Sequence, residues 1–324
     1  MAITYRSFLN SDLPHLVDIW RSQPPQRALV QPMSIGLFDE LVTSKQYFDP
    51  RGLILALEDG APIGFTHAAF GPNDAESAVA KQMGVTHVVM VRPHHQRRGI
   101  GRELLTRGEA YLRDEGAGVI YAGGIGHLDG FYLGLYGGSE MPGVLDSCPA
   151  AQQLFASAGY REIDRTLVFE REAATFRPPV DRRLMQWRRN AVVRVIHDPP
   201  ARSWWKASTH GNFAQMRLEL DLKTPAAAGV ASLTCWLMET FSAAWGVHAA
   251  GIVDLVVAEP FQRQGLGMFL VGEAFQQLRL QNVAVVEAQT MVHNTAAIGL
   301  YRKLGFAQVD AGAVYRKDAP DSER

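Results

Sequence analysis

The chain carries the segment Gln96-Arg97-Arg98-Gly99-Ile100-Gly101 and repeats it as Gln262-Arg263-Gln264-Gly265-Leu266-Gly267. The two segments lie 166 residues apart (262 − 96), which is about half of the 324-residue chain. Each follows a β-branched run typical of a buried strand, Val88–Val91 or Ile252–Val257, and each precedes apolar residues at helical spacing. The sequence therefore predicts a strand–turn–helix unit that occurs twice, as in a duplicated fold.

The repetition continues beyond that helix. Leu154-Phe155-Ala156-Ser157-Ala158-Gly159-Tyr160 parallels Leu300-Tyr301-Arg302-Lys303-Leu304-Gly305-Phe306. We expect a first copy at 1–172, a proline-rich and charged linker at 173–189, and a second copy at 190–324. In the second copy, 213–222 and 230–240 read as strands with no clear pair of helices before them. The second copy is therefore expected to be a trimmed version of the fold that lacks the first helices.

The repeated turn is typical of an anion site. Its glycines permit backbone angles closed to other residues, and the helix that follows offers unpaired N–H groups and the positive end of its dipole. Arg97, Arg98 and Arg263 add positive charge. The turn does not end in Gly-Lys-Ser/Thr, which excludes a P-loop, and leucine at 104 and 270 replaces the third glycine of a dinucleotide site.

Composition limits the classes of partner. The formal net charge is −1, so no overall field favours nucleic acid or a membrane surface. The N-terminus lacks the basic and apolar regions of a signal peptide, and no apolar run is long enough to span a membrane, so we expect a cytoplasmic protein. The two cysteines, Cys148 and Cys235, are not in a metal-binding pattern, and no metal is expected. The sequence does not indicate an oligomeric state.

Two motifs resemble those of the GCN5-related N-acetyltransferases (GNAT). Val91–Gly101 resembles the acetyl-CoA signature V-x-P-x-x-[QR]-x-x-G-x-[GA], and Val257–Gly267 matches it with the proline displaced by one residue. Asn294–Phe306 is similar to a second signature, N-x-x-A-x-x-L-Y-x-K-x-G-F. The resemblance implies an α/β (α+β) fold with two tandem acyl-CoA N-acyltransferase domains. Each would have a mixed, mostly antiparallel sheet flanked by helices, splayed between its fourth and fifth strands. The tandem layout also resembles that of mycothiol-synthase-like enzymes.

The resemblance implies acetyl-CoA as cosubstrate. It assigns the cofactor contacts to the strand ends and turns of both copies: Val89, Met90, Val91, Gln96, Arg97, Arg98, Gly99, Ile100 and Gly101 in the first, and Leu255, Val256, Val257, Gln262, Arg263, Gln264, Gly265, Leu266, Gly267 and Asn294 in the second.

The implied reaction is direct attack of a primary amine, on a small molecule or peptide, at the acetyl thioester. Tyr301 matches the family's tyrosine, which protonates the departing thiolate; the alternative is an aromatic packing residue on a helix. Asn294 either holds the cofactor or caps its helix. The base that deprotonates the amine is Asp254 or Glu287, and either carboxylate could instead be structural.

The first copy departs from the family pattern. Cys148 replaces the asparagine and Phe155 the tyrosine, and a phenyl ring cannot donate a proton. We therefore expect the second copy to be the catalyst. His87 lies where some family members carry a catalytic histidine, or is a core residue. The glycine-rich segment 123–143 either shapes the substrate entrance or packs the two copies together. The alternative function is a CoA-binding sensor with little turnover.

Overall fold

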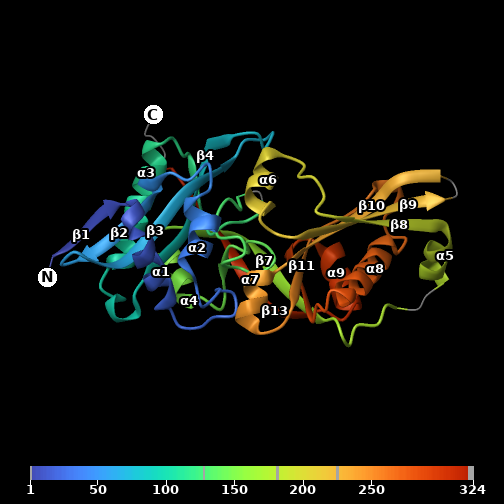
Figure 1. Ribbon diagram of the computed structural model, residues 1–324. Helices are drawn as coiled ribbons and strands as arrows, with labels where there is room; N and C mark the ends of the chain where they lie inside the picture. Colours follow the sequence, from blue (N-terminus) through green and yellow to red (C-terminus); the bar gives the residue numbers. More distant parts are fainter. Residues whose placement is uncertain (1, 127, 180–181, 224–225, 320–324) are drawn as a thin grey trace.

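The computed structural model describes residues 2–126, 128–179, 182–223 and 226–319. The first copy forms the half coloured blue to green in Figure 1, and the second the half coloured yellow to red. The elements of the first half are β1 (Ile3–Ser7), α1 (Leu13–Arg21), α2 (Ile35–Phe38), β2 (Leu53–Glu58), β3 (Ala61–Pro72), β4 (Val79–Val91), α3 (Ile100–Asp114), β5 (Val119–Ala122), β6 (Val144–Leu145), α4 (Pro149–Ser157) and β7 (Arg161–Glu172).

The second half repeats the order with a shorter beginning. Its elements are α5 (Arg182–Asn190), β8 (Ala191–His197), α6 (Trp204–His210), β9 (Gln215–Lys223), β10 (Ala226–Leu237), α7 (Glu239–Trp245), β11 (Ala249–Val257), α8 (Leu266–Leu280), β12 (Val285–Met291), α9 (Thr295–Lys303) and β13 (Ala307–Asp318). The two strands expected near 213–222 and 230–240 are β9 and β10. The single helix α6 stands between the first two strands, where the first half has α1 and α2. The segment expected to be a linker contains most of α5.

The strands form one continuous sheet across both halves. Among the described residues the order is β1-β2-β3-β4-β5-β13-β7-β12-β11-β10-β9-β8, with β6 beside β13. The pairs β4–β5 and β11–β12 are parallel, and the other pairs are antiparallel. The mixed, mostly antiparallel sheet expected from the sequence is confirmed.

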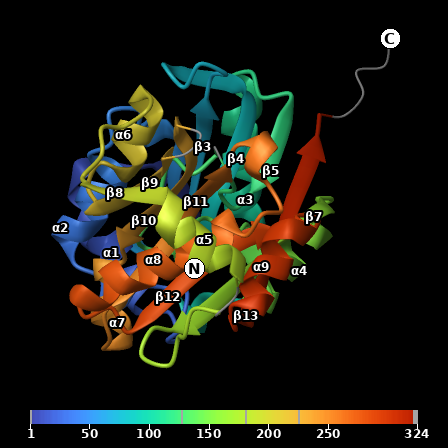
Figure 2. The same cartoon turned by 90° about the vertical axis from the view of Figure 1, so that its right-hand side faces the viewer.

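The two halves exchange their last strands. β13 of the second half pairs with β5 of the first, and β7 of the first half pairs with β12 of the second. Figure 2, viewed from the second half, shows β13 running toward β5. The sequence repeat predicts the segments 1–172, 173–189 and 190–324, and the backbone hydrogen bonds of the sheet cross between the two predicted copies.

Aromatic contacts repeat across this exchange. Phe155 on α4 lies 5.2 Å from Tyr160 and 6.2 Å from Tyr315 of β13, measured between ring centroids. Tyr301 on α9 lies 5.2 Å from Phe306 and 5.7 Å from Phe169 of β7. Each helix residue therefore packs against a strand supplied by the other half, so the core of each half depends on the other.

The segment 123–143 fills the space between the halves. The indole N–H of Trp236 donates to the carbonyl of Ser139 at 2.9 Å, and the Gln289 amide donates to the carbonyl of Gly137 at 2.9 Å. Gly138 has φ +101, and a Cβ there would lie 2.1 Å from Oε1 of Glu287. Only glycine fits this approach. Packing between the two halves, one of the two roles expected for the segment, is present in the structure.

Candidate functional site

The two repeated turns have the same backbone conformation. Gly99 and Gly265 precede α3 and α8 with φ +81 and +88, and Arg97 and Arg263 have φ +62 and +58. Positive φ is strongly disfavoured for residues other than glycine, so its recurrence at both arginines indicates one specific loop shape. Such a turn directs the free N–H groups of the helix start toward one point, as an anion site requires.

The surroundings of the second glycine also match. A Cβ on Gly101 would lie 3.8–3.9 Å from Leu154, Val89 and Val91. A Cβ on Gly267 would lie 3.6–4.0 Å from their counterparts, which are Leu300, Leu255 and Val257. Each Cβ would thus be in ordinary van der Waals contact with these three side chains, so the second glycine of each turn lies close to the preceding strand and the neighbouring helix.

Glutamine fixes each turn to the strand before it. The Gln96 side chain donates to the carbonyl of Val91 at 3.1 Å, and the Gln262 side chain donates to the carbonyl of Val257 at 3.0 Å. These side chains therefore hold the loop shape. The side chain of Arg98 pairs with Glu58 at 2.5 Å, and the side chains of Ile100 and Leu266 are buried in the core. Arg98, Ile100 and Leu266 can therefore contact a ligand only through their main-chain atoms.

Each turn lies at the end of a gap in the sheet. β4 and β5 pair up to Thr86–Ala122, and β11 and β12 pair up to Ile252–Ala288. Beyond these points each parallel pair separates. The predicted cofactor residues at the ends of β4 and β11 lie on the separated portions, and Val256 is 49% exposed.

In the first half the gap opens into a cavity of about 540 Å³. The cavity extends from the turn at Gly99 and Gly101, past the end of β4, to Trp20 and Tyr132. The predicted residues Val89, Met90, Val91, Gln96, Arg97, Gly99 and Gly101 line it. The structure thus brings together most of the cofactor residues expected in the first half.

Both departures from the family pattern lie on this cavity. Phe155 and Cys148 line it, and the thiol of Cys148 donates to the side-chain oxygen of Gln26 at 2.9 Å. Burial raises the pKa of this thiol. The cavity therefore has no phenol at the position that corresponds to Tyr301.

Three polar residues that line or adjoin the inner end of the cavity were not assigned together from the sequence. His87 lines the cavity with 7% exposure, and neither ring nitrogen has a partner among the described residues. His67 lies 5.9 Å from it, measured between ring centroids, and Nδ1 of His67 is 3.1 Å from the hydroxyl of Tyr132. Burial lowers the pKa of His87 to about 3 and that of His67 well below its usual value. His67, His87 and Tyr132 lie on β3, on β4 and in the 123–143 segment. Because they are far apart along the chain, no local sequence pattern indicates that they form one group.

In the second half, Tyr301 is 5% exposed and packs within the core. Burial, followed by the charges of Glu140 and Cys235, raises the pKa of its hydroxyl. That hydroxyl makes no hydrogen bond to another described residue. Asn294 caps α9, since its side chain accepts from the amide of Ala297 at 3.1 Å.

The two candidate bases differ in setting. Glu287 is fully buried and accepts from the Ser139 amide at 2.6 Å, while Arg27 lies 3.3 Å away. Asp254 is part-exposed on β11, just beyond the last paired residue, and lies 3.4 Å from Arg202. The structure places Glu287 in a hydrogen-bonded contact between the halves and Asp254 at the gap.

A third carboxyl group, Glu140, joins this region from the 123–143 segment. Burial raises its pKa to about 8, with further contributions from the charges of Asp129, Glu287 and Asp254, while Lys206 lowers it. A carboxyl group that titrates near neutral pH is suited to proton transfer. The sequence gave no signal for Glu140, because it lies in the other half of the chain.

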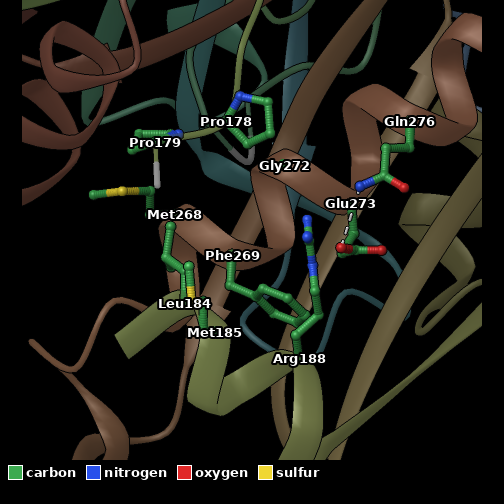
Figure 3. A pocket seen from close by; sticks show the side chains of 10 residues that line it. All are labelled: Pro178, Pro179, Leu184, Met185, Arg188, Met268, Phe269, Gly272, Glu273 and Gln276. Atoms are coloured by element: carbon green, nitrogen blue, oxygen red, sulfur yellow. Dashed lines mark hydrogen bonds between the residues drawn. The ribbon is translucent and has the colours of Figure 1, made fainter. Parts of the chain in front are cut away.

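Helix α5 lies beside the second turn. The indole N–H of Trp187 donates to the carbonyl of Gln264 at 2.8 Å, and Leu184 would lie 3.7 Å from a Cβ on Gly265. A cavity of about 130 Å³ separates α5 from α8 and is lined by Leu184, Met185, Phe269 and Gly272, among others (Figure 3). Neither Tyr301 nor Asn294 lines it.

The residues present fit acetyl-CoA. A pyrophosphate matches the N–H groups at each helix start, and the cavity of the first half continues from that point into the gap of the sheet. Across the described ranges, no cluster of three His, Cys, Asp or Glu side chains is arranged to hold a metal ion. Nor does any helix in those ranges have the length and apolarity needed to cross a membrane.

Known proteins resemble this chain in parts. A segment is 37% identical over 84 residues to a mycothiol acetyltransferase from Cellulomonas flavigena, which covers 25% of this chain and 24% of that protein. Another match, 31% over 77 residues, is to an N-alpha-acetyltransferase from Sulfurisphaera tokodaii, over 24% of this chain and 46% of that protein. The alignment thus spans about a quarter of the length of the mycothiol acetyltransferases, such as 26% of the one from Rhodococcus erythropolis.

Solved structures share the whole fold. A tandem GNAT protein from the clavulanic acid biosynthesis pathway aligns with a TM-score of 0.64 at 14% identity, over 99% of this chain and all of that one. A fungal multi-domain GH3 β-N-acetylglucosaminidase, described as having a GCN5-related glucosamine N-acetyltransferase region, aligns with a TM-score of 0.72 at 15% identity, over 98% of this chain and 38% of that one. The family model for GNAT acetyltransferases matches residues 13–127 and again 182–306, which together make up most of the chain. The chain therefore belongs to the acetyltransferase (GNAT) family, as a tandem of two copies of its fold.

Proposed function

We propose that the protein transfers the acetyl group of acetyl-CoA directly to a primary amine of a small molecule or peptide. The observation that carries this proposal is the pair of matching turns, each at the mouth of a gap in the sheet. Bound acetyl-CoA would supply an activated acyl group at that gap. The names of two similar proteins, an N-alpha-acetyltransferase and a glucosamine N-acetyltransferase, support an amine as acceptor.

We place the amine chemistry in the second half. Tyr301 and Asn294 both match the family signature there, whereas the first half has Phe155 and Cys148. In this proposal the main chain near Val256 donates to the acyl oxygen, and Tyr301 gives its proton to the departing sulfur. Burial raises the pKa of the tyrosine, so its hydroxyl carries a proton at neutral pH.

Of the two carboxylates, Asp254 is the better candidate base. The oxygens of Glu287 are already hydrogen-bonded, and its burial at the contact between the halves supports a structural role. Asp254 lies at the opening of the gap and is part-exposed. Glu140 is close enough to interact with the charge of Asp254, and its raised pKa of about 8 keeps this carboxyl group mostly protonated at neutral pH.

The alternative, a CoA-binding sensor, is favoured for the first half by the missing phenol at position 155. Incubation with acetyl-CoA and a panel of alkylamines separates the two functions. We expect CoA release above the hydrolysis background, together with acetylated amine detected by mass spectrometry. Tight acetyl-CoA binding without any acetylated product would support the sensor.

A further inference from the structure

We propose that helix α5 is part of the second cofactor site, and that Trp187 on this helix is a positioning residue that orients the main chain of the second turn toward the pyrophosphate of acetyl-CoA. The inference rests on the proposed binding of acetyl-CoA. It adds an element of which the sequence predicts only a linker. A hydrogen bond and a side-chain contact from α5 to the turn carry it.

The hydrogen bond of Trp187 sets the direction of one peptide group in the turn. Its indole N–H donates to the carbonyl of Gln264 at 2.8 Å. The peptide bond between Gln264 and Gly265 is trans, so its carbonyl and its N–H point in opposite directions. Because the carbonyl points toward α5, the N–H of Gly265 points away from it. Gly265 is the N-cap of α8, so this N–H belongs to the helix start that offers donors to an anion.

A side chain of α5 contacts the same glycine. A Cβ on Gly265 would lie 3.7 Å from Leu184, so α5 packs directly against the turn. A Cβ on Gly267 would instead lie against Leu255 of β11 and Leu300 of α9. The helix therefore supports the turn at one place, and the strand that borders the gap in the sheet contacts it at another.

Helix α5 is itself held in position, so Trp187 is placed before the cofactor arrives. Figure 3 shows Leu184 and Met185 of α5 beside Met268 and Phe269 of α8, with which they line a common cavity. At the end of α5 the carbonyl of Arg189 accepts from the Lys223 ammonium at 3.1 Å. A donor group that is oriented in advance loses little conformational freedom when the ligand binds.

The first turn has a different neighbourhood. A Cβ on Gly99 would meet no described atom within 4 Å. Arg98, which corresponds to Gln264, directs its side chain to Glu58 of β2. The effect of Trp187 should therefore be confined to the second turn, and the first turn serves as an internal reference.

The charge of α5 also suits the phosphate groups of CoA. Four of its nine residues are exposed arginines, and the second turn adds the exposed Arg263. The four are Arg182, Arg183, Arg188 and Arg189. The positive potential of such a group attracts a polyanion. The acetyl and pantetheine parts of acetyl-CoA carry no charge, so α5 should affect the nucleotide part alone.

Acetyl-CoA and acetyl-pantetheine make a matched pair of donors, because they transfer the same acetyl group and only acetyl-CoA has phosphates. Gly101→Leu blocks the first turn, so kinetics in that background, with benzylamine as acceptor, report on the second half. Adding Trp187→Phe keeps an aromatic ring and removes the N–H. It should lower kcat/KM for acetyl-CoA by about three- to tenfold through KM, with kcat unchanged. The value for acetyl-pantetheine should not change, which also shows that the variant folds. Gln186→Ala, at an exposed residue of the same helix, is the control and should change neither.

Equal losses with both donors would give Trp187 a merely structural role and overturn the inference, as would full activity with acetyl-CoA. A calorimetric titration with CoA tests the inference without turnover. Trp187→Phe alone should weaken one of the two CoA sites by about three- to tenfold and leave the other unchanged. Unchanged affinity at both sites would also overturn the inference. A protein that binds CoA in this manner but acetylates no amine would contradict only the proposed function.

Discussion

The main-chain amide of Ser139 donates a hydrogen bond of 2.6 Å to the fully buried carboxylate of Glu287. Ser139 belongs to the first half and Glu287 to β12 of the second. The contact therefore joins the two halves at the centre of the continuous sheet, near the exchanged strands. Arg27, from the first half, lies against the same carboxylate at 3.3 Å and against Glu170 of β7.

Glu287→Gln should destabilise the protein by about 3 kcal/mol, because it removes a buried charge whose hydrogen-bond donors remain. The measurement is the free energy of unfolding in urea. Glu172→Gln, at an exposed glutamate on the neighbouring strand β7, should change it by less than about 0.5 kcal/mol. If Glu287→Gln instead keeps full stability and loses acetylation of benzylamine, Glu287 is the base and the structural role is wrong.

Tyr301→Phe should lower kcat for an alkylamine by about ten- to a thousandfold and leave the Kd for acetyl-CoA unchanged. The reason is that only the proton donor is lost, while the ring keeps its contacts with Phe169 and Phe306. Steady-state kinetics and calorimetry measure the two quantities. Tyr160→Phe removes a hydroxyl from the matching cluster of the first half and serves as the control. A variant with full kcat would leave Tyr301 as a packing residue.

Stability should depend on pH through Glu140. Its pKa rises from the ordinary 4.5 to about 8, so between these values the folded protein binds a proton that the unfolded chain has lost. Stability therefore falls as pH rises through this window, because deprotonation places a charge near Glu287, Asp254 and Asp129. Melting curves at pH 5 and pH 8.5 should show Glu140→Gln gaining about 2 kcal/mol over the unaltered protein at the higher pH. An equal difference at both values would contradict the account.

The sequence predicted the two turns because their determinants are local. Two glycines, one glutamine and the strand–helix context recur in order, and the structure confirms the positive φ at Gly99 and Gly265. The strands β9 and β10 were predicted for the same reason. The mixed sheet and the tandem family assignment, which came from the resemblance, also hold.

The strand exchange was not predictable in this way. β7 and β13 have similar burial patterns, and no local sequence feature indicates whether Phe169 or Tyr315 packs against its own half or the other half.

The grouping of residues at the inner end of the cavity was not predictable either. His67, His87 and Tyr132 come from three segments, and only the folded 123–143 segment brings Tyr132 to the histidines. The position of Glu140 near Glu287 and Asp254 likewise depends on how the 123–143 segment folds against the second half.

The central claim is that each repeated turn holds one acetyl-CoA, and counting bound cofactor tests it most directly. Gly101→Leu and Gly267→Leu each add a large side chain between the helix and the preceding strand. A Cβ at either glycine already contacts three neighbouring side chains, so the rest of the leucine must extend into the turn. Native mass spectrometry or calorimetry should find two molecules of acetyl-CoA per chain in the unaltered protein, one in each variant and none in the double variant. Undiminished binding in both single variants would contradict the account.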